Sequence, residues 1–149
     1  MSGVEDLVRW LRAQLDEDEQ AAHAATDGPW TPWRNSTMRG LGDLLHVVLT
    51  PGQKPGAKAV IVTASWLDAE HIARHDPARV LREIDAKRQL LALHVPTPHE
   101  DEGDPWPGCS TCSWRDEMDD LRVRYPCPTV RLLALPYTGR PGYLDAWRP

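Results

Sequence analysis

The sequence lacks phenylalanine and has just three cysteines, whereas it contains seven tryptophans and fourteen prolines. Three cysteines cannot all pair with one another in disulfides, so free thiols or metal ligands are expected instead of a disulfide framework. No run approaches the roughly eighteen apolar residues that cross a bilayer. Glu5 and Asp6 occupy positions where a signal peptide would be basic and then apolar. These absences predict a soluble, cytoplasmic protein with no membrane partner.

An excess of basic residues is also missing, because the net charge is -5. Acidic residues concentrate in the first part of the chain and again in residues 99–120, while basic residues gather in residues 74–88. Attraction to nucleic-acid phosphates is weak for such a chain. We expect a protein partner, reached through helix faces or loop tryptophans. A nucleic-acid-binding regulator that uses the 74–88 face is the alternative, and the candidates there for binding an anion or a partner are Arg74, Arg79 and Arg82.

Several catalytic motifs are absent from the sequence. There is no P-loop, no G-x-G-x-x-G and no G-x-S-x-G, so neither nucleotide binding nor acyl transfer is indicated. His71 and His75 lie four residues apart beside Asp76 and could serve a metal-dependent hydrolase. The same residues also fit a helix end and the N-cap of the next helix. We expect a module without catalytic activity and keep the hydrolase as an alternative.

The length of 149 residues suits one ordinary domain. Apolar residues at helical spacing predict an amphipathic helix that starts near Val4 and stops at Gly28 and Pro29. Two short β-branched runs, 44–49 and 59–62, predict a hairpin with a wide loop. This hairpin needs a helix or a third strand beside it, because two strands alone are marginal in water.

Three further helices are predicted from local signals. Ser65 and Asp68 have capping-box spacing ahead of a helix over residues 66–75. Asp76 before Pro77 starts another helix that runs to about His94. A short helix follows Cys127. The pattern predicts an α+β fold, a mostly helical single domain over residues 1–149.

Residues 97–124 are acidic, rich in proline and glycine, and without apolar periodicity, so something must hold them in place. Cys109 and Cys112 form a Cys-x-x-Cys pair, and Cys127 stands at a helix start, which favours a thiolate. His94 is the preferred fourth ligand because a helix fixes its position, and His99 is the alternative. A structural Zn²⁺ would thus tie residues 97–124, since three thiolates and one imidazole form a closed site. Reduced thiols or a redox pair remain open interpretations.

Two strings carry a resemblance, HIARHDPARVLRE at residues 71–83 and YPCPTVRLLALPY at residues 125–137. They resemble a family of small uncharacterised proteins from actinobacteria and their phages, and the chain is more distantly similar to Ead-like accessory proteins of temperate phages. Residues 33–66 look like a variable insert in that family. The resemblance implies a phage or mobile-element origin, and for a protein of that origin we expect the partner to be a host protein. It also implies that a His, a Cys-x-x-Cys pair and a later Pro-Cys, which recur in the family, correspond here to His94, Cys109, Cys112 and Cys127. It implies no particular activity.

Overall fold

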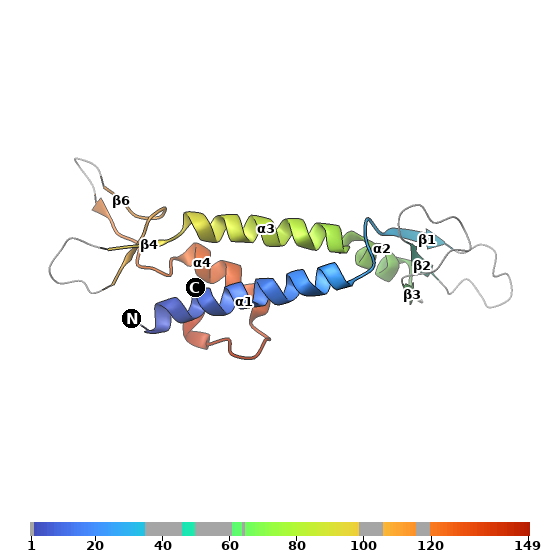
Figure 1. Cartoon of the computed structure of the whole chain (residues 1–149), viewed down its shortest axis with the longest axis horizontal. Helices are drawn as coiled ribbons and strands as arrows, with labels where there is room; N and C mark the ends of the chain where they lie inside the picture. Colours follow the sequence, from blue (N-terminus) through green and yellow to red (C-terminus); the bar gives the residue numbers. More distant parts are fainter. Residues whose placement is uncertain (1, 35–45, 50–60, 64, 99–105, 116–119) are drawn as a thin grey trace. The chain divides into compact units, whose positions relative to one another are not determined.

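The computed structural model describes residues 2–34, 46–49, 61–63, 65–98, 106–115 and 120–149 (Figure 1). The helices among them are α1 (Ser2–Ala24), α2 (Trp66–Arg74), α3 (Pro77–Leu93) and α4 (Pro128–Ala134), and two 3-10 turns follow as η1 (Leu135–Tyr137) and η2 (Asp145–Trp147). The strands are β1 (Thr31–Arg34), β2 (His46–Leu49), β3 (Ile61–Thr63), β4 (Pro96–Thr97), β5 (Gly108–Cys109), β6 (Trp114–Arg115) and β7 (Asp120–Leu121). The predicted α+β, mostly helical class is confirmed. Among these helices, none is long and apolar enough to cross a membrane.

The chain divides into two compact units. The first, which we call the metal unit, comprises residues 1–17 and 85–149, and the second, the sheet unit, comprises residues 18–84. The helices α1 and α3 each contribute residues to both. The expectation of a single domain over residues 1–149, with 33–66 as a variable insert, stays a prediction.

The sheet unit contains a three-stranded antiparallel sheet in the order β1-β2-β3. The predicted hairpin is confirmed in the pairing of β2 with β3, where Val47 lies opposite Val62. The predicted wide loop between the two runs, 50–58, lies outside the described residues, as do residues 59 and 60 of the second run. Strand β1 was not predicted, because Pro32 lacks an N–H and reads as a strand breaker. At the edge of a sheet proline is tolerated, and here Pro32 pairs with Val48 of β2.

Both predicted helix starts in the sheet unit are confirmed. The Asp68 N–H donates to the Ser65 hydroxyl at 3.4 Å, and the Arg79 N–H donates to Asp76 Oδ1 at 2.7 Å. Asp76 is buried, and its Oδ2 accepts a second hydrogen bond, of 3.2 Å, from the Trp30 N–H. One carboxylate therefore both caps α3 and holds the segment that follows α1. The close approach also restricts Gly28, where an added Cβ would lie 3.0 Å from Asp76 Oδ2.

The core of the metal unit grows from the predicted apolar stripe of α1. Leu7, Leu11 and Leu15, spaced four apart, are fully buried. Their buried companions in this unit are Leu91, Tyr125, Val130, Ala134, Tyr137 and Trp147. Arg131 secures the end of this unit, because its guanidinium donates to the carbonyls of Pro126 and Ala146, each at 3.0 Å.

Trp10 of α1 connects distant parts of the metal unit. Its ring lies 5.4 Å from Trp147 and 5.6 Å from Tyr143, between centroids, and its indole N–H donates to the Pro141 carbonyl at 3.0 Å. The next residue, Gly142, has a φ of +85°, and an added Cβ would lie 2.9 Å from Trp10 Nε1. Glycine is therefore required here for both conformation and space.

Gly142→Ala is expected to lower the free energy of unfolding by about 2 kcal/mol, since a left-handed alanine alone costs about 1–2 kcal/mol and Trp10 must also move. Chemical denaturation followed by circular dichroism measures the change. The matched control is Gly139→Ala, because a Cβ there meets nothing within 4 Å. Equal effects of the two substitutions would contradict this account of Gly142.

Candidate metal centre

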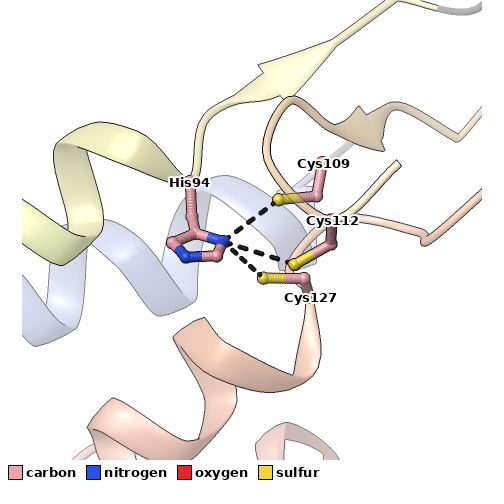
Figure 2. Close-up of side chains that lie close together, drawn as sticks. All are labelled: His94, Cys109, Cys112 and Cys127. Atoms are coloured by element: carbon pink, nitrogen blue, oxygen red, sulfur yellow. Dashed lines mark hydrogen bonds between the residues drawn. The ribbon is translucent and has the colours of Figure 1, made fainter. Parts of the chain in front are cut away.

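Four side chains from three segments converge in the metal unit (Figure 2). His94 directly follows α3, Cys109 ends β5, Cys112 lies in the turn after it, and Cys127 is the N-cap residue of α4. One ligand atom from each lies within 4.8 Å of the other three. The structure thus brings together the three predicted cysteines and the preferred histidine.

The contacts between the histidine and the cysteines are equal in length. His94 Nδ1 lies 3.4 Å from the Sγ atom of Cys109, of Cys112 and of Cys127. Tetrahedral zinc with Zn–N of about 2.0–2.1 Å and Zn–S of about 2.3 Å places nitrogen and sulfur about 3.5 Å apart. A ring nitrogen carries one proton or one lone pair and cannot make three full hydrogen bonds at once. Convergence on a shared cation accounts for all three distances together.

The surroundings and the donor set also fit a metal. His94, Cys109 and Cys127 are buried, Cys112 is half-buried, and the three cysteines are free of disulfides. Soft thiolates with one imidazole are ligands that Zn²⁺ prefers. Four protein donors complete a tetrahedral shell, which leaves no coordination position for water or a substrate.

Short backbone ladders hold the Cys-x-x-Cys turn in place. Strand β5 pairs with β4 so that Cys109 lies opposite Pro96. The Cys109 N–H donates to the Val123 carbonyl at 2.8 Å, and the Ser113 N–H donates to the Cys109 carbonyl at 2.9 Å. Part of the predicted 97–124 loop is therefore regular structure, while 99–105 and 116–119 lie outside the described residues.

The two residues inside the Cys-x-x-Cys turn dock it onto the end of α3. The Ser110 hydroxyl donates to the Leu93 carbonyl at 2.9 Å and accepts from the Val95 N–H at 3.1 Å. The Ser110 N–H donates to the Val95 carbonyl at 2.9 Å, and the Thr111 hydroxyl also donates to the Leu93 carbonyl. These bonds satisfy a carbonyl that a helix end leaves without an intrahelical partner. We call this set of contacts the hydroxyl clamp; sequence reasoning missed it, although two hydroxyl residues between the cysteines were a visible signal.

Ser110→Ala is expected to weaken zinc affinity about tenfold, within the range for partners that orient metal ligands. The hydroxyl clamp holds the Cys-x-x-Cys turn against the end of α3. It therefore sets the sulfurs of Cys109 and Cys112 at their equal distance of 3.4 Å from His94 Nδ1. Competition with a chromophoric chelator measures the affinity. Ser65→Ala, which removes a helix-capping hydroxyl in the sheet unit, should leave zinc affinity unchanged. Equal affinities for wild type and Ser110→Ala would contradict the role of the clamp.

The thiols differ in their ionisation. Burial of the Cys109 thiol opposes its ionisation, but backbone N–H groups of Cys112 and Thr111 bond the sulfur and bring its pKa below the ordinary value. Burial and the neighbouring sulfurs of Cys127 and Cys109 raise the pKa of Cys112 to about 11. Burial, and then the charge of Cys127, raise the pKa of the Tyr125 hydroxyl. Besides burial, the converging sulfurs oppose the ionisation of Cys112, and a cation shared between them would remove this opposition.

The other candidate residues lie elsewhere. His99 falls outside the described residues. Arg74 pairs with Glu70 at 2.7 Å, and Arg79 pairs with Glu83 at 2.7 Å, so each has a carboxylate on its own helix. Arg82 is exposed. Binding of an anion or a partner by these arginines stays a prediction.

The rings of His71 and His75 lie side by side, with centroids 4.3 Å apart and planes inclined by 43°. His75 Nδ1 lies 2.8 Å from the His71 carbonyl, and the Asp76 carboxylate is occupied as an N-cap. Within the described ranges, the single group that brings three or more metal-ligating side chains together is the one at His94. The hydrolase alternative therefore gains no third ligand from the described part of the chain.

Comparison with known proteins gives a family without an assigned activity. A family model described as a family of unknown function, DUF6221, matches residues 4–149. No curated protein and no solved structure matches the chain.

Proposed function

We propose that this chain, which belongs to the DUF6221 family of unknown function, is a non-enzymatic module organised by one structural zinc ion. The observation that carries the proposal is the set of three equal contacts from His94 Nδ1 to three sulfurs. Zinc would be held by His94, Cys109, Cys112 and Cys127. When bound, it would supply a cross-link between the end of α3, the Cys-x-x-Cys turn and the start of α4.

A structural role suits this centre better than a catalytic one. Three thiolates donate charge to a metal and reduce its Lewis acidity, and a full protein shell leaves no site for a reacting water. Apart from its tryptophans, the sequence around the centre is acidic and rich in proline and glycine. A structural zinc contributes on the order of 10 kcal/mol, which exceeds what such a polar segment gains by burial.

Native mass spectrometry of untagged protein, compared with its mass under denaturing conditions, tests the zinc proposal. The expected result is one zinc per chain, lost in Cys127→Ser and kept in Ser65→Ala. A copurified metal other than zinc would overturn the choice of metal. A metal-free native chain that ignores added zinc would overturn the centre itself.

We further propose that the metal unit binds a host protein, consistent with the resemblance to actinobacterial and phage proteins. Support comes from large apolar side chains exposed in this unit, among them Trp106 at 43% and Trp114 at 48%. The sequence just before Trp106 is acidic, with Glu100, Asp101 and Asp104. A partner surface that combines apolar and basic side chains would complement both features.

Affinity purification from host lysate with matched tryptophan variants tests this surface. Trp106→Ser and Trp114→Ser together should abolish the retention of a basic host protein. The control Trp33→Ser removes a comparably exposed tryptophan, 42%, from the sheet unit and should retain it. Retention that is insensitive to the metal-unit tryptophans, or lost equally in the control, would overturn the assignment.

A further inference from the structure

Cys112 differs from the other residues of the candidate metal centre in its exposure. Cys109 and Cys127 are fully buried, whereas Cys112 is half-buried. The imidazole of His94 is buried as well. The two residues before Cys112 are exposed, so its turn faces solvent. A small reagent dissolved in water therefore reaches Cys112 before it reaches either buried cysteine.

The backbone places Cys112 and Cys109 at the two ends of one short turn (Figure 2). The Ser113 N–H closes this turn by donating to the Cys109 carbonyl at 2.9 Å. The sulfurs of the two cysteines lie within 4.8 Å of each other. A disulfide requires about 2.0 Å between its sulfurs. Rotation of two side chains on the same turn can close this gap.

Cys127 belongs to a separately anchored segment. It is the N-cap residue of α4 and lies between two prolines, each of which fixes its own φ. The Arg131 guanidinium also holds this segment by donating to the Pro126 carbonyl at 3.0 Å. A disulfide from Cys112 to Cys127 would depend on this anchored segment, whereas one to Cys109 depends on the turn alone.

We propose that Cys112 is a modification site at which a hydroperoxide oxidises the metal centre, forms a disulfide between Cys112 and Cys109, and causes release of the zinc. This inference rests on the proposed zinc function, because a cysteine that binds a metal does so as the thiolate, which is also the nucleophilic form. The Cys112 thiolate attacks one peroxide oxygen, the O–O bond breaks, and a sulfenic acid forms while an alkoxide or hydroxide leaves. The Cys109 thiolate then attacks the Cys112 sulfur, the S–O bond breaks, and hydroxide leaves.

The two thiolates lose two electrons in these steps, and the peroxide gains them. With two protons from water, hydrogen peroxide yields two waters, and an organic hydroperoxide yields one water and one alcohol. Zinc takes no part in the electron transfer, since it has no redox chemistry. A disulfide sulfur carries no negative charge, so His94 and Cys127 alone remain as ligands. Half of a tetrahedral shell does not retain the ion, and the cross-link between the turn and α4 is lost.

Treatment of full-length, zinc-loaded protein with hydrogen peroxide tests the inference. Native mass spectrometry first measures the zinc content, a chromophoric chelator then records zinc release, and alkylation with peptide mass spectrometry locates each thiol and disulfide. We expect one zinc released for each disulfide between Cys109 and Cys112. Cys127 should remain a free thiol and oxidise about tenfold more slowly, because oxidation follows exposure. Dithiothreitol with added zinc should restore the centre.

Two variants with matched donor sets assign the disulfide. Cys112→His and Cys127→His each leave two thiols and two imidazoles at the centre. Peroxide should join Cys109 to Cys112 in Cys127→His. At the same exposure to peroxide, the two buried cysteines of Cys112→His should stay reduced.

The outcomes separate this inference from the zinc proposal. A wild-type chain without zinc overturns the proposed function and this inference with it, whereas a loaded chain that keeps its zinc in peroxide overturns this inference alone. Oxidation at Cys127 first, or at all three cysteines at equal rates, also overturns it. The order of oxidation in wild type decides the question even if a variant fails to fold or to bind zinc.

Discussion

Removal of the proposed zinc ion is expected to unfold the Cys-x-x-Cys segment of the metal unit. A structural zinc contributes about 10–16 kcal/mol, and the total stability of a domain is about 5–15 kcal/mol, so the remaining contacts cannot compensate. Hydrogen exchange measures the effect at the amides of Cys109, Ser113 and Tyr125, each of which donates to a backbone carbonyl. Their protection should fall by about 100-fold or more after chelation.

Two controls accompany the chelation experiment. Added zinc should restore protection at these amides, whereas magnesium should not, because a hard cation prefers oxygen ligands. The Arg79 amide, capped by Asp76 in the sheet unit, serves as an internal reference. Unchanged protection at the three amides in fully demetallated protein would contradict a structural role for the metal.

Asp76→Ala is expected to be the most damaging single substitution in the sheet unit, at about 3 kcal/mol of unfolding free energy. The carboxylate is buried and accepts two backbone hydrogen bonds, from Arg79 and Trp30. Bonds to a charged acceptor contribute about 1.5–3 kcal/mol each, and buried donors left unpaired add a penalty. Urea denaturation followed by helical circular dichroism measures the difference.

The comparison for Asp76 is Ser65→Ala, which removes an ordinary N-cap and should cost about 1 kcal/mol. Asp76→Asn keeps an oxygen acceptor without the charge and should fall between the two. If Asp76→Ala costs no more than Ser65→Ala, then the Trp30 bond contributes nothing and the carboxylate acts on α3 alone.

Local signals explain why much of the fold was predictable. Asp76 followed by Pro77 fixes a helix start through one side chain and one ring, and the structure begins α3 at Pro77. Gly28 and Pro29 mark the end of the first helix in the same way, and α1 ends at Ala24. Such signals depend on neighbouring residues and so can be read without knowing the rest of the molecule.

The residues of the candidate metal centre could also be predicted in part. The Cys-x-x-Cys spacing identifies half a site, and Cys127 follows from its place before a helix. The choice of His94 depended on the helix reaching that far, and the structure ends α3 one residue before it, at Leu93. We preferred His94 to His99 because a helix fixes the position of a ligand. His94 directly follows α3 in the structure, which agrees with this reason.

Contacts between distant residues could not be predicted. The Trp10 indole N–H donates to the Pro141 carbonyl, which is 131 positions away in the sequence, and no local pattern near either residue predicts this contact. The hydroxyl clamp joins Ser110 to Leu93, which requires the strand pairing of β4 with β5 first. Strand β1 contains Pro32, which a sheet tolerates at its edge, so predicting this strand requires knowledge of its partner β2. In each case tertiary structure decides what the local sequence leaves open.

The guanidinium of Arg131 gives the last residues of the chain an influence on the metal centre. It binds the carbonyl of Pro126, the residue before Cys127, and also the carbonyls of Ala146 and Arg148. Removing or displacing residues 146–148 would therefore disturb the position of Cys127, one of the proposed metal ligands.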